Sequence, residues 1–304
     1  MIAVIEQLMK HDVAGDPITG VRWTRRTTQK ISLQLARLGI RVCARTVARL
    51  LKNLRYCLRV NHKRVSQGSG PDRNEQFEYV AEKRTQFAEH DLPIVSIDPK
   101  KRELVGNRST PELVNDHDFR SESNGIAIPH GVYDVRANCG TVFVGTSHDT
   151  PDFAADNLTR WWVTEGRQRY RGASQLLVLA DSGGSNSPRI RAFKYALQTR
   201  LVDQHRISVT VCHYPSGASK WNPIDHRLFS QISGNWAGQP LRNYETILNF
   251  IRTTKTKTGL RVRARLVDHD YPTGIKISDA DFATLALEPH ETQPQRNYTI
   301  RPRS

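Results

Sequence analysis

Residues Ser219–Phe229 have the sequence SKWNPIDHRLF, and the rest of the chain is organised around this stretch. Asn222 is a favourable residue for a helix N-cap, and Pro223 suits the first helical position. Ile224 and Leu228 then recur at an interval of four residues, which gives one apolar helix face. The pattern predicts a buried helix that begins at this point.

Asp225 falls in the first turn of the predicted helix, and its role has two interpretations. A carboxylate in this position can accept a hydrogen bond from a free backbone N–H group, as in a capping box. Alternatively, the carboxylate belongs to a catalytic site, which would require further acidic residues to converge on it. The local sequence leaves both interpretations open.

The composition indicates a protein with a polyanionic partner. The chain has 304 residues, of which 38% are hydrophobic, so a sizeable core can form. Its formal net charge is +15, and its sequence pI is near 10. A surplus of this size favours nucleic acid as the partner over a membrane, and the sequence has no run of about 18 apolar residues that could span a bilayer.

The cysteines and the N-terminus predict a reduced, cytoplasmic protein. Residues Met1–Asp16 lack the basic segment, apolar segment and cleavage site of a signal peptide. The four cysteines lie far apart and have no paired spacing, so we expect neither a zinc site nor a disulfide framework. They are Cys43, Cys57, Cys139 and Cys212.

The positive charge is concentrated near the N-terminus. Residues Pro17–Pro71 contain no acidic residue, and Val21–Arg64 contains ten arginines and three lysines. Apolar periodicity predicts helices at Thr28–Leu38 and Ala44–Asn53, separated by a turn at Gly39. Two helices joined by a short glycine turn are typical of a helix-turn-helix motif.

The second of these helices is the predicted recognition helix. Arg45, Thr46 and Arg49 face away from its apolar stripe, where they could reach phosphates or base edges in a major groove. The alternative is a solvated basic face on an ordinary helical hairpin. The DNA contacts expected in this region are Arg25, Arg26, Arg41, Arg45, Thr46 and Arg49.

Pattern changes along the chain predict four regions. Residues 1–70 form a basic, all-α helix-turn-helix region, 71–91 a connecting helix, and 288–304 an extended polar tail. Between them, residues 92–287 alternate between strand-like and helix-like periodicity, which predicts an α/β domain with a mixed sheet.

Two predicted strands in this domain end in a carboxylate. Asp98 follows the apolar run Pro93–Ile97, and Asp181 follows Gln175–Ala180. Ligands in α/β proteins gather at the carboxyl ends of strands, so we expect both residues to converge with Asp225. Clustered carboxylates repel one another unless cations lie between them, and their hard oxygen ligands suit Mg²⁺ or Mn²⁺. Two such ions can activate a water and stabilise the leaving oxygen of a phosphodiester.

Four segments of the chain resemble the DDE transposases of bacterial insertion sequences, specifically the ISAzo13 family, and more distantly the IS630/Tc1/mariner group. The segments are IDPKKRELVGN (Ile97–Asn107), GVYDV (Gly131–Val135), LADSGGSN (Leu179–Asn186) and SKWNPIDHRLFS (Ser219–Ser230).

This resemblance implies an RNase H-like catalytic domain in which Asp98, Asp181 and Asp225 are the metal-binding and catalytic triad. It implies that the protein binds double-stranded DNA at terminal inverted repeats and at a target, as a dimer or higher oligomer, and catalyses cleavage and strand transfer with two Mg²⁺ or Mn²⁺ ions. Lys220 and Arg227 flank Asp225 and would hold DNA phosphates, although Arg227 could instead pair with a neighbouring acid.

The chain departs from the family pattern in ways that leave alternatives open. The family has Glu where this chain has Asp225, and relatives carry a further helix-turn-helix segment before the position of Met1, as expected if this copy is truncated. The alternatives are a catalytically inactive DNA-binding remnant and a metal-dependent RNase H-like nuclease without strand transfer. Asp134 and Asp149 are rival carboxylates.

Overall fold

The structure is a computed structural model, and it describes residues 2, 4–5, 13–15, 22–24, 27–54, 56, 71–105, 125–218, 221–237, 239 and 241–304. The chain divides into two compact units, Met1–Gln67 and Gly68–Ser304.

The smaller unit contains the two predicted helices, α2 (Thr28–Arg37) and α3 (Ala44–Asn53). The Thr27 side chain accepts a hydrogen bond from the backbone N–H of Lys30 and so caps α2. Gly39 follows α2 with a φ of 81°, a left-handed conformation that glycine adopts without strain. The two helices pack through buried apolar side chains, which include Ile31, Leu35, Val47, Leu50 and Leu51.

The expectation that this region is all-α was wrong in one respect. Two short strands, β1 (Val13–Gly15) and β2 (Arg22–Thr24), pair in antiparallel fashion. Strands of three residues are too short to show a period-two pattern in the sequence, because such a pattern needs at least four residues.

The larger unit is built around one mixed sheet. Its strand order is β10-β11-β8-β7-β3-β5-β6-β9, and β4 pairs with β5. The strands are β3 (Ile94–Pro99), β4 (Glu103–Val105), β5 (Gly125–Asp134), β6 (Cys139–Gly145), β7 (Gln175–Ala180), β8 (Ser208–His213), β9 (Arg261–Val267), β10 (Leu287–Pro289) and β11 (Asn297–Ile300). Strands β3, β7 and β8 are parallel, whereas β5 is antiparallel to both β3 and β6. This order and these directions confirm the mixed sheet that the sequence predicted and the RNase H-like domain that the resemblance implied.

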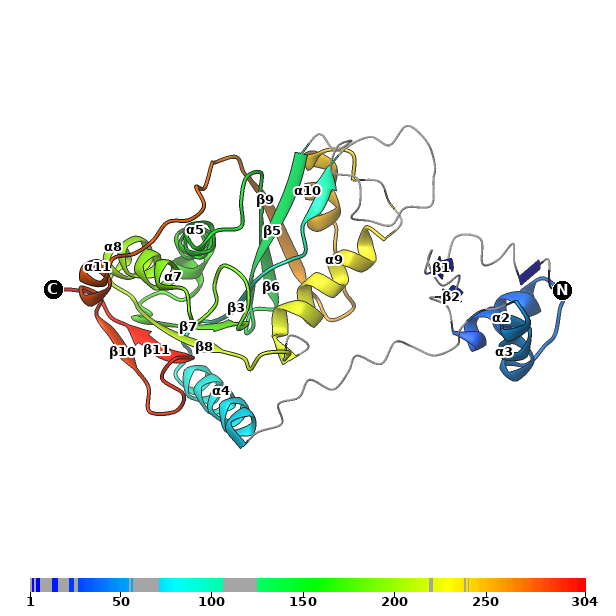
Figure 1. The fold of residues 1–304 in the computed structure, drawn as a ribbon, viewed down its shortest axis with the longest axis horizontal. Helices are drawn as coiled ribbons and strands as arrows, with labels where there is room; N and C mark the ends of the chain where they lie inside the picture. Colours follow the sequence, from blue (N-terminus) through cyan, green and yellow to red (C-terminus); the bar gives the residue numbers. More distant parts are fainter. Residues whose placement is uncertain are drawn as a thin grey trace. The chain divides into compact units, whose positions relative to one another are not determined.

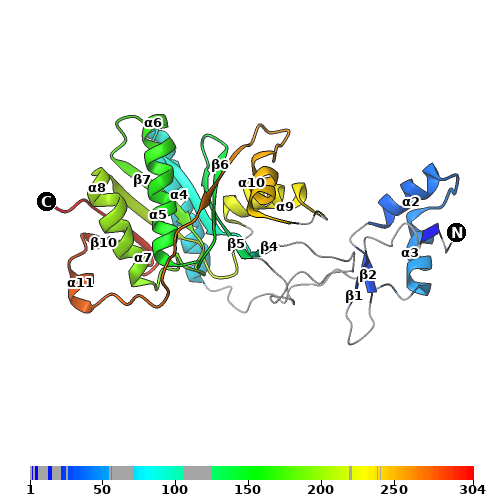
Figure 2. The same ribbon diagram turned by 90° about the horizontal axis from the view of Figure 1, so that it is seen from above.

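Helices cover both faces of this sheet. On one face lie α5 (Pro151–Trp161) with its continuations η2 (Trp162–Gly166) and α6 (Arg167–Arg169), and α7 (Arg191–Ala196) with η3 (Leu197–Val202) and α8 (Asp203–His205). The opposite side is covered by α4 (Pro71–Glu89), η5 (Asp225–Phe229), α9 (Ser230–Asn235) and α10 (Tyr244–Arg252), as Figures 1 and 2 show. The short helix α11 (Asp279–Ala283) precedes β10.

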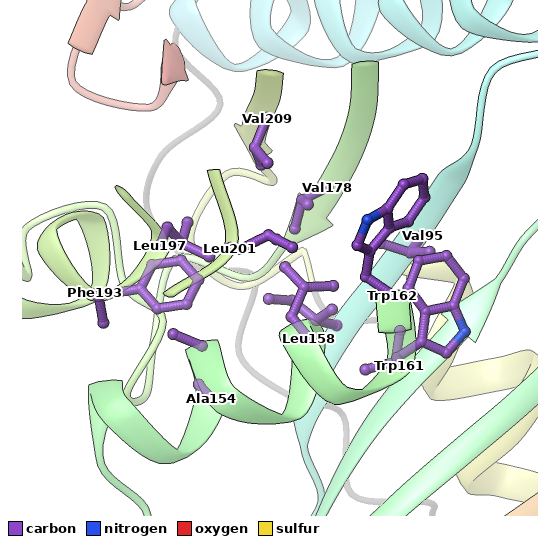
Figure 3. Close-up of a cluster of buried hydrophobic side chains, with 14 of the residues drawn as sticks. Val95, Ala154, Leu158, Trp161, Trp162, Val178, Phe193, Leu197, Leu201 and Val209 are labelled. Carbon is purple, nitrogen blue, oxygen red and sulfur yellow. The ribbon is translucent and has the colours of Figure 1, made fainter. Parts of the chain in front are cut away.

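The main core lies between the sheet and the α5–α7 layer (Figure 3). Leu158, Phe193 and Leu201 from the helices meet Val95 and Val178 from the sheet. Trp161 and Trp162 are both buried, at 1% and 4% exposure, so neither is available for stacking on a base.

Helix α4 packs on the sheet as part of the larger unit. Its residues Val80 and Phe87 contact buried apolar side chains of β3 and β7. Within the described residues, none of the helices combines the length and the apolar character needed to cross a bilayer.

The expectation of a separate extended tail at residues 288–304 was wrong. Strand β11 pairs with β8 in the sheet, and all four of its residues are buried. The polar residue Asn297 tolerates burial because its side-chain amide exchanges two hydrogen bonds with that of Gln76 on α4, at 2.7 and 2.8 Å. Tyr298 and Ile300 contribute to the main core.

Candidate metal centre

Two neighbouring parallel strands bring Asp98 and Asp181 together. Asp98 is the second-last residue of β3, and Asp181 follows directly after β7. Ile97 pairs with Ala180 in the register of these strands, so the two aspartates leave the sheet at the same edge. The sequence predicted this arrangement from the position of each carboxylate at the end of an apolar strand.

Asp225 reaches the same edge from the π-helical segment η5. This segment lies close to the sheet because Gly131, the partner of Asp98 on β5, has no side chain. A Cβ atom at Gly131 would lie 2.7 Å from Ile224 Cδ1 and 2.8 Å from Phe229 Cζ. The glycine therefore permits the close approach that carries Asp225 to the strand ends.

The three carboxylates converge, as the sequence predicted. One oxygen atom each from Asp98, Asp181 and Asp225 lie within 4.8 Å of one another. None of the three forms an ion pair with a basic residue in the described part of the chain. Three uncompensated carboxylate oxygens fit the hard, oxygen-preferring divalent cations Mg²⁺ and Mn²⁺.

The raised pKa values of the three carboxyl groups reflect their burial and mutual repulsion. Burial raises the pKa of Asp98 well above its ordinary value, and the nearby charges of Asp181, Asp225 and Asp149 raise it further. Burial, followed by the charge of Asp181, raises the pKa of Asp225 to about 6. The pKa of Asp181 is also raised by burial, against the lowering effect of a hydrogen bond from Asn222. A cation in this position would relieve the repulsion.

Asn222 anchors the site, a role that the sequence did not reveal. Its fully buried side chain donates a hydrogen bond of 3.0 Å from Nδ2 to Asp181 Oδ1 and accepts one at Oδ1 from the Ser96 hydroxyl. The Ser96 hydroxyl in turn accepts from the backbone N–H of Ile224, at 3.3 Å. The side chain thus ties β3, Asp181 and the start of the helix together instead of capping the helix.

The structure favours the metal-site interpretation of Asp225 over the capping interpretation. Among the described residues, no backbone N–H donates a hydrogen bond to its side chain, whereas its carboxylate lies among those of Asp98 and Asp181. The contact of Asp225 with the start of the helix is a backbone hydrogen bond from its N–H to Asn222 O, at 3.2 Å.

The rival carboxylates lie outside this group. Asp134 is fully buried at the end of β5, beside Val95 near the start of β3, where it forms a 2.6 Å ion pair with Arg169. Asp149 is nearer, since its charge acts on Asp98, but its carboxylate accepts a 2.7 Å hydrogen bond from Ser185. His213 is buried and its Nδ1 contacts the backbone oxygen of Asp181 at 2.9 Å, a structural position.

The predicted DNA-binding residues divide into three groups. Arg41, Arg45 and Arg49 are exposed, and a shallow depression on α3 is lined by Cys43, Arg45, Thr46, Ala48, Arg49 and Lys52. Arg227 is exposed on η5 and forms no ion pair with a described acid. Arg25, Arg26 and Lys220 lie outside the described residues.

Comparison with known proteins gives a family match and several similar structures. The solved structures to which the chain is similar include "Mos1 transposase paired-end complex with left transposon end", at 15% identity over 83% of this chain and 69% of that chain, with a TM-score of 0.43. They also include "Crystal structure of a pre-cleavage Mos1 transpososome", at 13% identity over 83% of this chain and 70% of that chain, with a TM-score of 0.44. A third is "Crystal structure of the Mos1 mariner paired end complex with Mn" (13%, 83%, 70%, 0.41). No curated protein matches the sequence. The family model described as "Rhodopirellula transposase DDE domain" matches residues 4–302, nearly the whole sequence. The chain therefore belongs to this family of DDE transposases, of the ISAzo13 type.

Proposed function

We propose that Asp98, Asp181 and Asp225 are the catalytic triad of this transposase and together bind two Mg²⁺ or Mn²⁺ ions. DDE transposases are metal-dependent enzymes of DNA strand cleavage and strand transfer, and the chain belongs to them. The observation that carries the assignment of residues is the convergence of one oxygen from each carboxylate to within 4.8 Å. Glutamate is the family's third ligand, and here the shorter aspartate takes its place.

The residues of the chain hold the reacting groups in place. Strand ends β3 and β7 fix Asp98 and Asp181, and Asn222 orients the Asp181 carboxylate through its 3.0 Å hydrogen bond. When bound, divalent cations lower the pKa of the attacking water or 3′-hydroxyl and stabilise the leaving oxygen of the phosphodiester. The partial burial of the three carboxylates limits the water that could compete for the same site.

The proposed substrate is double-stranded DNA, at the terminal inverted repeats of an element and at a target site, within the bacterial cytoplasm. Helix α3 would enter the major groove with Arg41, Arg45, Thr46 and Arg49, while Arg25, Arg26, Lys220 and Arg227 would contact phosphates. The protein would act as a dimer or higher oligomer on DNA. The proposed regions are 1–70 for DNA binding, 71–91 for the connecting helix and 92–304 for catalysis.

A cleavage assay tests the triad. The substrate is a plasmid that carries the terminal repeats of the element, incubated with Mg²⁺, Mn²⁺ or EDTA. We expect metal-dependent cleavage by the parent protein and its loss in Asp98→Asn and Asp225→Asn, while Asp270→Asn, which changes an exposed carboxylate, retains activity. An Asp225→Asn protein that cuts as well as the parent would remove Asp225 from the triad.

The products of the same assay separate the alternatives. Joining of the cut 3′ end to a second DNA identifies strand transfer, whereas cleavage without joining would indicate a nuclease. A parent protein that binds DNA but never cuts would be an inactive remnant. The Asp225→Glu variant then shows how aspartate affects cleavage at this position. Its activity falls below that of the parent if the site has adapted to the shorter side chain. Its activity rises from a low level if the change from glutamate to Asp225 had inactivated this copy.

A second assay tests the recognition helix. Arg41→Ala, Arg45→Ala and Arg49→Ala should each weaken DNA binding, and the slope of log K against log salt should fall by about one unit for each phosphate that the variant no longer neutralises. Arg37→Ala, an exposed arginine on α2, is the matched control. Unchanged affinity and salt dependence in all three variants would show that α3 does not touch DNA.

A further inference from the structure

A second basic segment lies in the larger unit. Residues Arg252–Arg265 contain six basic residues and no acidic residue. They run from the end of α10 through a turn into β9, the last strand on its side of the sheet as described. We define the basic strip as Lys255, Lys257, Arg261, Arg263 and Arg265, all of which are exposed.

The strand turns its arginines to one face. Val262 and Ala264 pack into the apolar cluster beneath α10, and Arg263 pairs instead with Glu165 on the α5 side, at 3.0 Å. Since side chains alternate along a strand, Arg261 and Arg265 share the face of Arg263. Successive arginines are therefore roughly 7 Å apart, a spacing comparable with that of successive phosphates along one nucleic-acid strand.

The charge of the basic strip is largely uncompensated. The Glu165 side chain is 2% exposed, and it is shared between Arg263 and Arg169. Among the described residues, Lys255, Arg261 and Arg265 form no ion pair. A shallow depression at the turn combines basic side chains with hydroxyl groups, a set suited to phosphate oxygens. It is lined by Arg252, Thr254, Lys255, Thr256, Gly259, Leu260, Arg261 and Val262.

The sheet register gives the distance between β9 and the carboxylates. Asp98 pairs with Gly131, Gly131 with Val142, and Val142 with Ala264. Three interstrand steps separate Asp98 from Ala264, a distance of about 14 Å. This row faces η5 and α10, whereas Arg261, Arg263 and Arg265 project from the α5 side of the sheet. The basic strip therefore borders the β9 edge on the face opposite to the carboxylates.

A structural role for the charges accounts for only part of this pattern. Charged residues on an edge strand discourage pairing with other chains, which could explain the arginines of β9. Protection of the edge strand does not explain Lys255 and Lys257, which lie in the turn before β9 and outside the strand. A DNA backbone that follows the edge would contact both.

We propose that the basic strip binds the sugar-phosphate backbone of double-stranded DNA without reading its bases. The strip holds DNA along the β9 edge of the sheet. This inference rests on the proposed function, which gives double-stranded DNA as the substrate. The bound duplex is either an element end or target DNA.

Salt-dependent binding tests the proposal with the full-length chain. The variant combines Lys255→Gln, Arg261→Gln and Arg265→Gln. The control, with the same reduction in charge, combines Arg171→Gln, Arg206→Gln and Lys276→Gln, which are exposed residues outside the strip. The probe is a labelled random-sequence duplex. We expect the salt slope of the strip variant to fall by about 2–3 units, since each phosphate that is no longer neutralised removes about 0.9, and that of the control to stay near the parent value.

Equal slopes in the parent and the strip variant, both with the random duplex and with a duplex that carries the terminal repeat, would overturn the proposal and leave edge protection or an acidic protein partner as the explanation. An equal fall in both variants would overturn it as well, because it would show a general effect of net charge. A second duplex that carries the terminal repeat identifies the source: a fall with that duplex alone assigns the strip to element ends, a fall with the random duplex alone assigns it to target DNA, and a fall with both indicates a general backbone contact.

Chemical footprinting of the unaltered protein avoids any effect of substitution on folding. Amine acylation with and without each duplex should show protection of Lys255 and Lys257 relative to Lys276. Equal reactivity in the absence of DNA and in the presence of either duplex would overturn the proposal. Metal-dependent cleavage by the parent is measured separately and depends on the carboxylates, so a failure of the proposed function would be distinguished from a failure of this inference.

Discussion

Asn222 shows how one buried amide can organise a charged site. Its Nδ2 donates to Asp181, and its Oδ1 accepts from Ser96 on the neighbouring strand. A buried amide with both ends paired is stable, but a partner left unpaired in the interior is costly. The side chain therefore couples the fold around β3 to the orientation of a carboxylate.

We expect Asn222→Ala to lower the free energy of unfolding by about 1–3 kcal/mol, because Ser96 would lose its buried partner and the site would lose side-chain packing. It should also raise the Mg²⁺ concentration needed for half-maximal cleavage, since Asp181 would no longer be oriented. Ser96→Ala is the matched control, because it breaks the same network but spares the bond to Asp181. A variant with normal stability and normal metal dependence would contradict this role.

His130 makes stability sensitive to acid. Its ring is fully buried on β5, and neither nitrogen has a hydrogen-bond partner in the described part of the chain. Burial lowers its pKa to about 3, whereas the unfolded-state value is about 6.5. Below about pH 6.5 the unfolded chain binds a proton that the folded chain does not, so the stability present above that pH is lost progressively as the pH falls toward 3.

The corresponding prediction concerns His130→Leu. At pH 5 the parent should have lost about 2 kcal/mol through His130 relative to neutral pH, and the variant should not show this part of the loss. Urea unfolding of both proteins at pH 7 and pH 5 measures the difference, with EDTA present so that metal binding does not contribute. Equal losses in the two proteins would show that His130 does not titrate between the two states.

At the scale of elements, the approach of η5 to the sheet accommodates the short third ligand. Asp225 has one methylene fewer than the glutamate of the family, yet its oxygen lies within 4.8 Å of those of Asp98 and Asp181. The helix can lie this close because Gly131 and Gly140 present no side chains to Ile224, Phe229 and Leu228. The close position of the η5 backbone thus compensates for the shorter side chain of Asp225.

Gly131→Ala tests this relation. The new Cβ would lie within 2.9 Å of Ile224 and Phe229 atoms, so η5 must move away, and overpacking of this kind costs about 1–3 kcal/mol. We expect lower stability and a disproportionate loss of metal-dependent cleavage. Gly234→Ala is the matched control, because a Cβ at that position on α9 meets nothing within 4 Å. Full activity in Gly131→Ala would show that the spacing of η5 is not limiting.

At the scale of the whole larger unit, the sheet is completed by the last strand in the sequence. Strand β11 pairs with β8, and Tyr298 fills the main core with no exposed surface. The polar composition of this segment does not indicate a core strand. Asn297 can be buried there because its side-chain amide is hydrogen-bonded to Gln76, 221 residues away in the sequence.

Tyr298→Ala should cost about 3–5 kcal/mol, as expected for the removal of a large buried aromatic ring. Chemical denaturation measures the loss, and Glu291→Ala, which changes an exposed residue in the preceding loop, should have little effect. If Tyr298→Ala were as stable as the parent, the C-terminal strand would not be part of the cooperative core.

Local patterns determined much of this protein. Periodicity located α2 and α3, because their apolar residues recur at helical spacing and their buried faces meet. The positions of Asp98 and Asp181 at the ends of apolar strands predicted their convergence, because parallel neighbouring strands end at one edge. The resemblance to DDE transposases, carried by four short segments, predicted the third carboxylate and the family.

The tertiary structure alone decided the features that depend on distant partners. Asn222 had the sequence signature of an N-cap but bonds to Asp181, and the C-terminal segment had the composition of a tail but forms a core strand. The basic residues of β9 form an exposed row only because β9 is an edge strand whose Val262 and Ala264 are turned into the core. The physical reason is the same in each case: a side chain's preference is set by its immediate neighbours in the sequence, whereas hydrogen-bond partners and strand register are set by residues that folding brings together from far along the chain.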